Sequence, residues 1–185
     1  MAEYGRGGSE MRGVSYVQQG VVACREFIKL LMIGSDGRLE ASLPATDDER
    51  RDLEVHLKGR FGPSLSFQVK SARQLFHKGR MDYLVISMGV KPARVISNPR
   101  FWYFFAYLDF EKMAFKEPVF LVPSRHMHRA GAHGSTHGVA RFVFKASMDP
   151  TSSDTWQPYR LQTSAVGRRV LDILRDLPGK PGLSR

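Results

Sequence analysis

The chain contains one cysteine, Cys24, among its 185 residues. A single thiol excludes both an intramolecular disulfide and a cluster of thiolate metal ligands. Cys24 falls in an apolar stretch with helical spacing. Free cysteines in such stretches usually pack as small hydrophobic side chains, so we expect a buried residue rather than a reactive thiol.

Long apolar runs are also missing. A transmembrane helix needs about 20 consecutive apolar residues, whereas the most apolar stretches, FIKLLMI and FWYFFAYL, are too short or are interrupted by a charge. The N-terminal residues MAEYGRGGSEMRG are polar and lack the apolar centre of a secretory signal. We therefore expect a soluble, cytoplasmic protein with no membrane partner.

Two common enzyme signatures are absent. The Gly-rich GRGGS near the N-terminus has no following GKS or GKT and no preceding strand, so it does not predict a phosphate-binding loop. The sequence has no G-x-S-x-G, which sets aside a serine hydrolase of the nucleophile-elbow type.

Acidic residues are scarce relative to basic ones. The 18 Asp and Glu face 28 Lys and Arg, which gives a net charge of +10 and a sequence pI near 10.0. Arg6, Arg12, Lys180 and Arg185 lie in the terminal stretches, and a clear excess of basic residues remains without them. A compact domain this basic attracts polyanions, so the charge favours nucleic acid as the partner over an ordinary basic surface.

What is present is enough for one globular domain, because 42% of the residues are hydrophobic and the length is that of an average domain. We expect a single domain over residues 14–177, with disordered tails at 1–13 and 178–185.

Apolar periodicity predicts helices over residues 14–34 and 163–177. Alternating or continuous apolar runs predict strands over 39–44, 52–57, 64–70, 83–90, 101–110, 118–123 and 140–147. Residues 71–82 resemble an irregular or short helical connection, and residues 124–138 a polar loop. The order of helix, strands and helix predicts an α/β fold, with one mixed β-sheet flanked by α-helices on its faces.

Two of the predicted strands carry polar residues along one side. Asp52, Glu54 and His56 alternate with apolar residues in the first strand. Ser66, Gln68 and Lys70 alternate with apolar residues in the second. Because side chains in a strand point alternately to opposite faces, each polar set shares one face. The KGRFGP segment between them predicts an antiparallel hairpin, whose polar rows either face solvent or line a site.

Cleavage of a phosphodiester by a metal-activated water needs oxygen ligands for a hard cation such as Mg²⁺ and a further positive charge near the phosphate. Asp52 on one strand, with Gln68 and Lys70 two residues apart on the next, can supply these groups.

This pattern, Asp52 followed by Gln68-Val69-Lys70-Ser71, resembles the PD-(D/E)XK nuclease superfamily, which has the restriction-endonuclease-like fold, in its Q-x-K variant. An opening helix with a glutamate, Glu26, and the later stretches YFFAYLD and PVFLVPSRHMH resemble a bacterial branch of that superfamily. The resemblance extends over residues 14–177, and its specific part is the hairpin. It implies a metal-dependent nuclease acting on DNA, with Mg²⁺ or Mn²⁺ as cofactor. Homodimerisation, common among enzymes of this fold, is a further expectation.

The resemblance also implies roles for individual residues. Asp52 would be the central metal ligand, Gln68 would take the second ligand position, and Lys70 would orient the water and stabilise the transition state. Glu26 matches a helix carboxylate that contacts the metal directly or through water. Glu54 shares a face with Asp52 and is a reserve ligand.

Gln68 departs from the family pattern because an amide oxygen brings no charge to the metal. Two outcomes stay open: a working nuclease in which another acid compensates, or a nucleic-acid-binding module of the same fold that does not cut. A domain whose basic face docks a protein partner is a third alternative.

The segment 124–138 offers weaker candidates. His126, His128, His133 and His137 have spacings that zinc sites use, but no cysteine joins them, so a polar loop is the better interpretation. Arg125 and Arg129 in this segment, and Arg168 and Arg169 on the last predicted helix, are candidate nucleic-acid contacts.

Aromatic residues are the last group considered. Residues 101–105, FWYFF, form a continuous run, which favours core packing over base stacking. Trp156 and Tyr159 lie in a polar segment and either stack on a ligand or cap the core.

Overall fold

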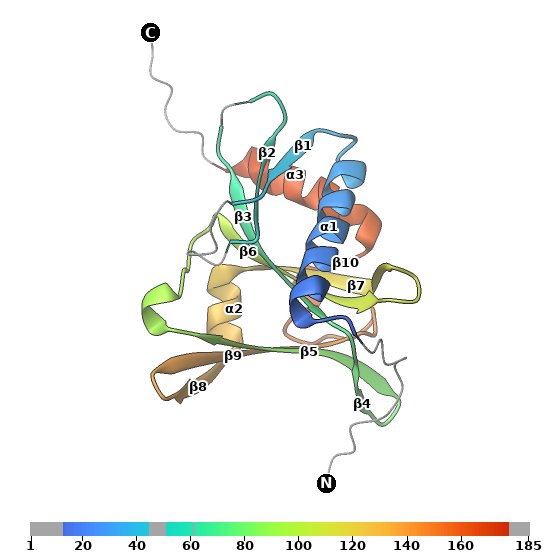
Figure 1. Ribbon diagram of the computed structural model, residues 1–185, viewed down its shortest axis with the longest axis vertical. Coiled ribbons are helices and arrows are strands. Elements are labelled where there is room, and N and C mark those ends of the chain that lie inside the picture. Colours follow the sequence, from blue (N-terminus) through green and yellow to red (C-terminus); the bar gives the residue numbers. More distant parts are fainter. Residues whose placement is uncertain (1–12, 45–50, 61, 178–185) are drawn as a thin grey trace.

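A computed structural model describes residues 13–44, 51–60 and 62–177 (Figure 1). The stretches 1–12 and 178–185, predicted to be tails, lie outside the described residues. None of the described helices is long and apolar enough to cross a membrane.

Three α-helices and ten β-strands make up the described chain. The helices are α1 (Tyr16–Gly34), α2 (Ser124–Ala130) and α3 (Val166–Asp176), with single 3-10 turns at Pro92–Arg94, Gln157–Tyr159 and Thr163–Ala165. The strands of a six-stranded sheet are β1 (Leu39–Ser42), β2 (Leu53–Leu57), β3 (Leu65–Ala72), β6 (Phe101–Asp109), β7 (Ala114–Pro123) and β10 (Arg160–Leu161). Those of a four-stranded sheet are β4 (Phe76–Lys78), β5 (Met81–Val90), β8 (Ala132–Thr136) and β9 (Val139–Ser147).

The six-stranded sheet is mixed, with strand order β1-β2-β3-β6-β7-β10. Only the central pair, β3 and β6, is parallel, and the other pairs are antiparallel. The predicted hairpin is β2 and β3, in which Leu53 pairs with Phe67 and Val55 with Leu65. The α/β class and the mixed sheet flanked by helices are confirmed.

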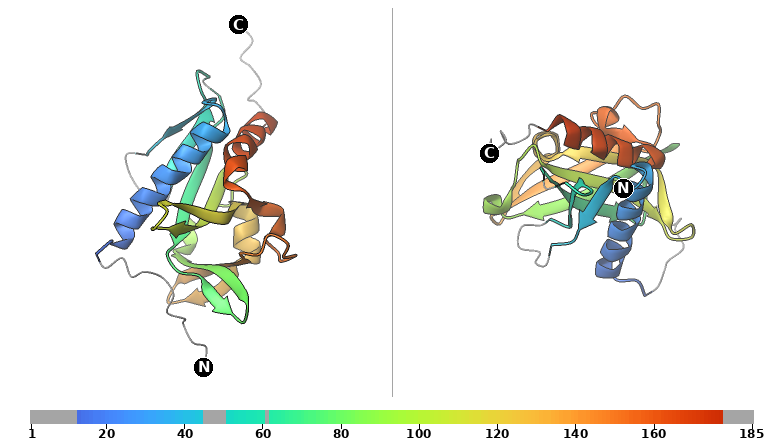
Figure 2. Two further views of the ribbon diagram at one scale, coloured as in Figure 1. Left: turned by 90° about the vertical axis from the view of Figure 1, so that its right-hand side faces the viewer. Right: turned by 90° about the horizontal axis from the view of Figure 1, so that it is seen from above.

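Helices α1 and α3 pack together on one face of this sheet (Figure 2). Helix α1 begins at a capping box, in which Ser15 and Gln18 bond each other's backbone N–H. Phe27 from its buried stripe stacks on Phe104 of β6, with ring centroids 4.2 Å apart. The aromatic run of β6 is thus core, as predicted, because Phe104 and Phe105 are fully buried.

Two glycines allow α1 and α3 to come into backbone contact. A Cβ built on Gly167 would lie 2.6 Å from the carbonyl carbon of Gly34 and 2.7 Å from the oxygen of Leu31. No side chain fits in that space, so the crossing point depends on glycine at both positions.

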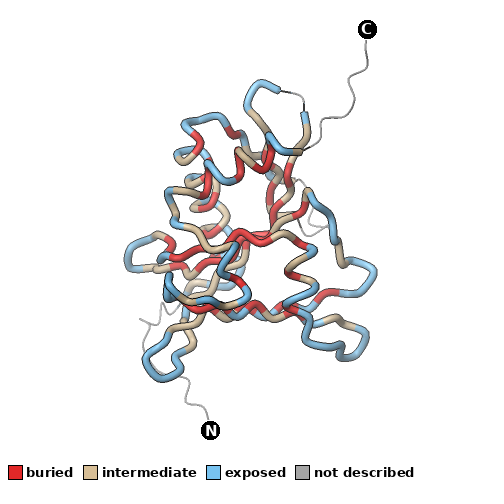
Figure 3. Tube along the Cα trace, turned by 180° about the vertical axis from the view of Figure 1, so that it is seen from behind, coloured by how far each residue is buried: buried red, intermediate tan, exposed pale blue. Residues whose placement is uncertain are grey.

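The opposite face of the six-stranded sheet is covered by α2 and the four-stranded sheet, and the core between them is visible as buried chain in Figure 3. Phe144 of β9 stacks on Phe105 of β6 at 4.2 Å and packs against Trp156 at 4.7 Å. Of the two roles predicted for Trp156, stacking on a ligand or capping the core, the structure supports the second.

The second sheet and α2 were not predicted. Residues 71–82 are not an irregular or helical connection. They contain the end of β3, all of β4 and the start of β5, and β4 and β5 are joined by a turn in which Gly79 has φ of 62°. Residues 124–138 are not a loop but form α2 and β8. Helix α2 has one fully buried apolar residue, Met127, so its sequence has no apolar stripe to reveal it.

Candidate functional site

The hairpin strands β2 and β3 have unequal lengths, and this difference creates the site. The last pair of their ladder joins Leu53 to Phe67, yet β3 continues to Ala72. The edge of β3 that follows Phe67 is therefore without a strand partner on the β2 side, among the residues that the structure describes. Groups that satisfy this edge come from side chains.

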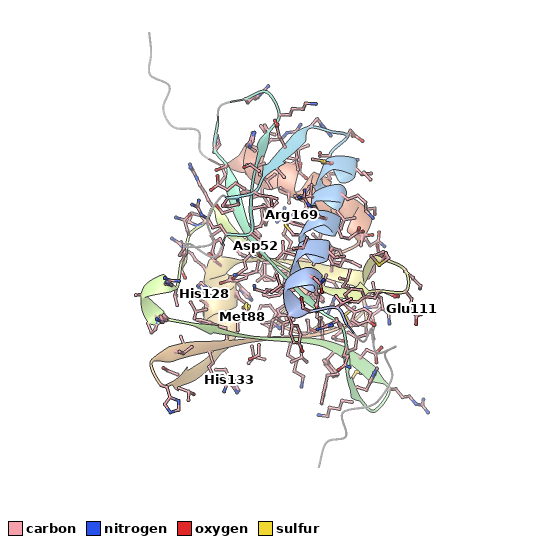
Figure 4. The ribbon with its side chains drawn as sticks, viewed as in Figure 1. Asp52, Met88, Glu111, His128, His133 and Arg169 are labelled. Carbon is pink, nitrogen blue, oxygen red and sulfur yellow. The ribbon has the colours of Figure 1, made fainter. Side chains whose placement is uncertain are left out.

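Asp52, immediately before β2, is the first such group. Its backbone N–H donates to the carbonyl oxygen of Phe67 at 2.8 Å, which continues the ladder by one bond. Its side-chain Oδ2 accepts a hydrogen bond from the backbone N–H of Val69 at 2.6 Å. The carboxylate is thereby fixed at the edge of β3, beside the residue that separates Gln68 from Lys70. Figure 4 shows Asp52 near the centre of the molecule.

Gln68 and Lys70 point to the face of the sheet opposite α1. Their neighbours Phe67 and Val69 lie in the core beneath α1 and α3, so the alternation of a strand turns the two polar side chains the other way. Gln68 is 5% exposed, and its amide makes no hydrogen bond with any part of the chain that the structure describes. Lys70 is half-buried and makes no ion pair within the same residues. Within the described residues, neither side chain has a polar partner of its own.

Glu54 already has partners. Its carboxylate pairs with the Arg51 guanidinium and accepts a hydrogen bond from the Ser66 hydroxyl at 3.4 Å. His56, one pair further along, contacts Glu40 on β1 at 3.6 Å. Of the three polar residues predicted to share a face, Asp52 is therefore bonded to the edge of β3, while Glu54 and His56 interact with other neighbours.

Glu26 lies on α1 and pairs with Lys29 at 2.6 Å, with its side chain 12% exposed. Within residues 13–44, 51–60 and 62–177, no three side chains of His, Cys, Asp or Glu converge as a metal-ligand group. Glu26, Glu54 and Asp52 therefore do not form a cluster of three carboxylates, and the role of the two glutamates as ligands stays a prediction.

The thiol of Cys24 on α1 is affected by the charge of Asp52. Burial first, and then the Asp52 carboxylate, raise the pKa of its thiol to about 11, while the Arg25 charge acts in the opposite direction. The expected burial is only partial, because Cys24 is of intermediate exposure and packs at the margin of the core. Asp52 therefore lies within electrostatic reach of α1.

Gln19 of α1 is a residue that the sequence analysis missed. Its Nε2 donates to the carbonyl oxygen of Ser71 at 2.8 Å and to the Ser71 hydroxyl at 2.9 Å. It thus satisfies the open edge of β3 next to Lys70, as Asp52 does two residues earlier. Its Oε1 is buried and has no hydrogen-bond partner in the described chain. The available signal was its position four residues before Ala23 and eight before Phe27, on the buried stripe of the helix.

The histidines of residues 124–138 do not lie together. His128 on α2 bonds the Ser97 hydroxyl through Nδ1 at 2.7 Å and the Tyr103 hydroxyl through Nε2 at 2.9 Å. Tyr103 is the register neighbour of Gln68 on the adjoining strand, so His128 supports the wall beside the site. Burial lowers the pKa of His128.

His126, two residues earlier on the same helix, turns away from His128 and lies against the rings of Tyr159 and Trp156, at 4.6 and 5.5 Å. Burial, and then the nearby Arg129 charge, lower its pKa. Residues two apart on a helix point in nearly opposite directions, so His126 and His128 do not form a zinc-binding pair.

The predicted nucleic-acid contacts fall in two places. Arg125 and Arg129 are exposed on α2, on the side of the sheet to which Gln68 and Lys70 point. Arg168 and Arg169 are exposed on α3, on the other side. The structure does not gather the four arginines on one surface.

The site combines one fixed carboxylate, one amide oxygen, and one ammonium group. Mg²⁺ usually keeps several waters and needs only one or two protein carboxylates when substrate phosphates complete its shell. The residues present fit such an ion: the Asp52 carboxylate and the Gln68 amide oxygen would hold it, and Lys70 lies on the same strand face as Gln68. The arrangement is suited to binding a phosphate diester beside a hard cation.

No protein-family model matches the chain, and no curated protein matches it in sequence. Among solved structures, the chain is similar to the bacterial homing endonuclease I-Ssp6803I, with a TM-score of 0.52 and 15% sequence identity. The similarity covers 88% of this chain and 95% of that chain. At this identity the likeness concerns the fold: the chain has an α/β fold of the kind seen in that endonuclease.

Proposed function

We propose that the protein is a metal-dependent nuclease that hydrolyses phosphodiester bonds of DNA. The observation that carries the proposal is the hydrogen bond from the Val69 N–H to the Asp52 carboxylate. It fixes an acid beside Gln68 and Lys70, two side chains that are without polar partners in the described residues. A fold similar to that of a homing endonuclease and a net charge of +10 support DNA as the substrate.

Three residues have roles in the proposed reaction. Asp52 and Gln68 bind a divalent cation, Mg²⁺ or Mn²⁺, through their side-chain oxygens. When bound, such an ion lowers the pKa of a coordinated water and neutralises charge on the phosphate. Lys70 stabilises the negative charge that develops on the phosphate oxygens and orients the attacking water. His128 and Tyr103 keep the neighbouring strand face in place.

The test is cleavage of plasmid DNA in Mg²⁺ or Mn²⁺ by the wild type and by Lys70→Ala. Loss of one electrostatic donor typically lowers the rate about 100- to 1,000-fold, and we expect a loss of that order. Lys58→Ala removes an exposed lysine at the end of the same hairpin and is the matched control. Circular dichroism verifies that both variants fold. Cleavage by Lys70→Ala at the wild-type rate would contradict the proposal.

One observation favours a second function, a module of the same fold that binds nucleic acid without cutting it. Gln68 stands where a second carboxylate would strengthen the metal site, and the described residues contain no compensating cluster of acids. In that case neither metal supports cleavage, while DNA binding weakens linearly with the logarithm of the salt concentration. Binding without salt dependence would exclude both functions and leave protein docking.

A further inference from the structure

Carboxylates are missing from two long stretches of the chain. Residues 83–108 and 118–148 contain no Asp or Glu, but they contain seven Lys and Arg and four His. These two stretches pair with each other, because β5 pairs with β9 and β6 with β7, and α2 packs between them. Most of the excess positive charge of the chain is therefore concentrated on one part of the molecule, without acidic residues to balance it.

The outer face of the four-stranded sheet displays part of this charge. In β9, Phe142, Phe144 and Ala146 are buried, so Arg141 and Lys145 point to the opposite, exposed face. Arg141 is paired in register with Gly89 of β5, which has no side chain to cover it. The guanidinium is thus unobstructed by its neighbour.

Lys145 is held in place rather than freely mobile. Its Nζ lies 5.3 Å from the ring centroid of Phe76 and 5.0 Å from that of Tyr83, which are both on the same outer face. Cation–π contacts of this kind restrain a lysine and leave its charge unpaired by a carboxylate. A positioned cation is better suited to a phosphate than a flexible one, because less conformational freedom is lost on binding.

Next to Arg141, the ribbon of β8 and β9 extends from the sheet. All five residues of β8 are exposed, and β8 is an edge strand that pairs only with β9 in the described sheet. A bulge sets His133 and Gly134 opposite Arg141. His133 and Thr136 share the outer face with Arg141, because they lie opposite Arg141 and Val139, whereas Ser135 pairs with Ala140 and lies on the other face. The strand has no large apolar residue, so it presents hydrogen-bonding groups to solvent.

We propose that the outer face of β8, β9 and β5 docks in the major groove of duplex DNA. The choice of duplex DNA rests on the proposed function. The major groove admits a two-stranded ribbon, Ser and Thr hydroxyls and imidazoles bond base edges, and Arg and Lys bond the flanking phosphates. In Figure 4 His133 lies in the lower part of the molecule, and Asp52 lies well above it, nearer the centre. The docking surface is separate from the Asp52 site.

The first test measures affinity for a duplex by fluorescence anisotropy in metal-free buffer, where no cleavage occurs. Arg141→Ala and Lys145→Ala should each weaken binding about tenfold at low salt. Each should also reduce the slope of log affinity against log salt by about one, as for the loss of one phosphate contact. Lys112→Ala is the matched control, because Lys112 has a side chain 79% exposed and its Nζ lies 4.0 Å from the Asp109 carboxylate. If the three variants bind alike, the proposal is overturned.

The second test identifies the groove. Methylation of guanine N7 blocks the major groove, and it should weaken binding of the wild type but not of a His133→Ala/Thr136→Ala double variant. An RNA duplex of the same sequence has a major groove too narrow for a ribbon, so its binding should not depend on the double substitution. If methylation weakens binding of both proteins equally, or if the double substitution weakens RNA binding as much as DNA binding, major-groove docking is overturned.

Failure of this inference differs from failure of the proposed function. If neither metal supports cleavage but DNA affinity still depends on Arg141 and Lys145, the nuclease proposal fails and the docking surface stands. Cleavage that depends on Lys70, combined with wild-type affinity in the Arg141 and Lys145 variants, would do the reverse. A wild type that does not bind duplex DNA in metal-free buffer would overturn the docking surface directly.

Discussion

Cys24 on α1 and Asp52 before β2 are electrostatically coupled: the carboxylate of Asp52 adds to the effect of burial in raising the thiol pKa to about 11. Because Cys24 is the only cysteine of the chain, a thiol reagent reports on this one position. The pair therefore offers a measurement of charge at the proposed metal site that does not depend on catalysis.

We predict that Mg²⁺ accelerates alkylation of Cys24. An ion bound at Asp52 offsets the negative charge, lowers the thiol pKa and increases the reactive thiolate fraction. Burial is the larger cause of the raised pKa, so the gain in rate should be modest, roughly two- to tenfold at pH 8. The rate of iodoacetamide labelling measured against Mg²⁺ concentration should rise to a plateau.

Asp52→Asn provides the control for this measurement. It should label faster than the wild type without metal, and Mg²⁺ should not change its rate. Asp36→Asn, which removes an exposed carboxylate near the end of α1, should behave as the wild type does. A wild-type rate that is insensitive to Mg²⁺ would show that no ion binds at Asp52.

Substitution of Gln68 should change metal affinity in a defined direction. Gln68→Glu adds a second charged oxygen ligand, so the Mg²⁺ concentration that gives half-maximal cleavage should fall about tenfold. Gln68→Met removes the oxygen with little change in volume, and the required concentration should rise. The Mg²⁺-induced increase in melting temperature should follow the same order, because binding to the folded state stabilises it. An unchanged metal requirement in both variants would remove Gln68 from the site.

The hairpin was predictable because the period of a strand is fixed. Alternation of Leu53 and Val55 with polar residues determines which side chains share a face, and the same holds for Phe67 and Val69. The α/β class followed from the order of helices and strands. The hydrogen bond from the Val69 N–H to Asp52 was not predictable. It forms because β3 extends beyond the end of its pairing with β2, and tertiary contacts determine where strands end.

Other features were hidden for different reasons. Apolar residues at Val17 and Val21 of α1 are 78% and 57% exposed, whereas Gln19 is buried at 4%, so hydropathy located the helix but not its buried stripe. Helix α2 and strand β8 are short and polar, and they form because neighbouring elements pack against or pair with them. Sequence periodicity carries no signal for elements stabilised in that way.

The contact between Gly34 and Gly167 predicts a pair of opposite stability effects. Gly167→Ala places a methyl group 2.6 to 2.7 Å from backbone atoms of α1, which must move, and overpacking of this kind typically costs about 1–3 kcal/mol. Gly20→Ala lies on the exposed side of the same helix with nothing within 4 Å, and should stabilise by about 1 kcal/mol through helix propensity. Urea unfolding followed by circular dichroism measures both. Equal midpoints for the two variants would contradict a tight crossing.

His128 should make the fold less stable in mild acid. Burial lowers its pKa below the ordinary 6.5, so between these two values the unfolded chain binds more protons than the folded one. The resulting contribution to the unfolding free energy is complete above pH 6.5 and is lost as the pH falls through the folded pKa. Urea midpoints measured from pH 7.5 to 5 should therefore fall with pH in the wild type.

The fall should be smaller in His128→Gln, which removes the titrating ring that bonds Ser97 and Tyr103. A residual slope should remain from His126, whose pKa is lowered in the same direction by burial and by Arg129. His133→Gln changes an exposed histidine of β8 and is the matched control. If His128→Gln and His133→Gln show the same dependence on pH, the buried ring of His128 is not the titrating group.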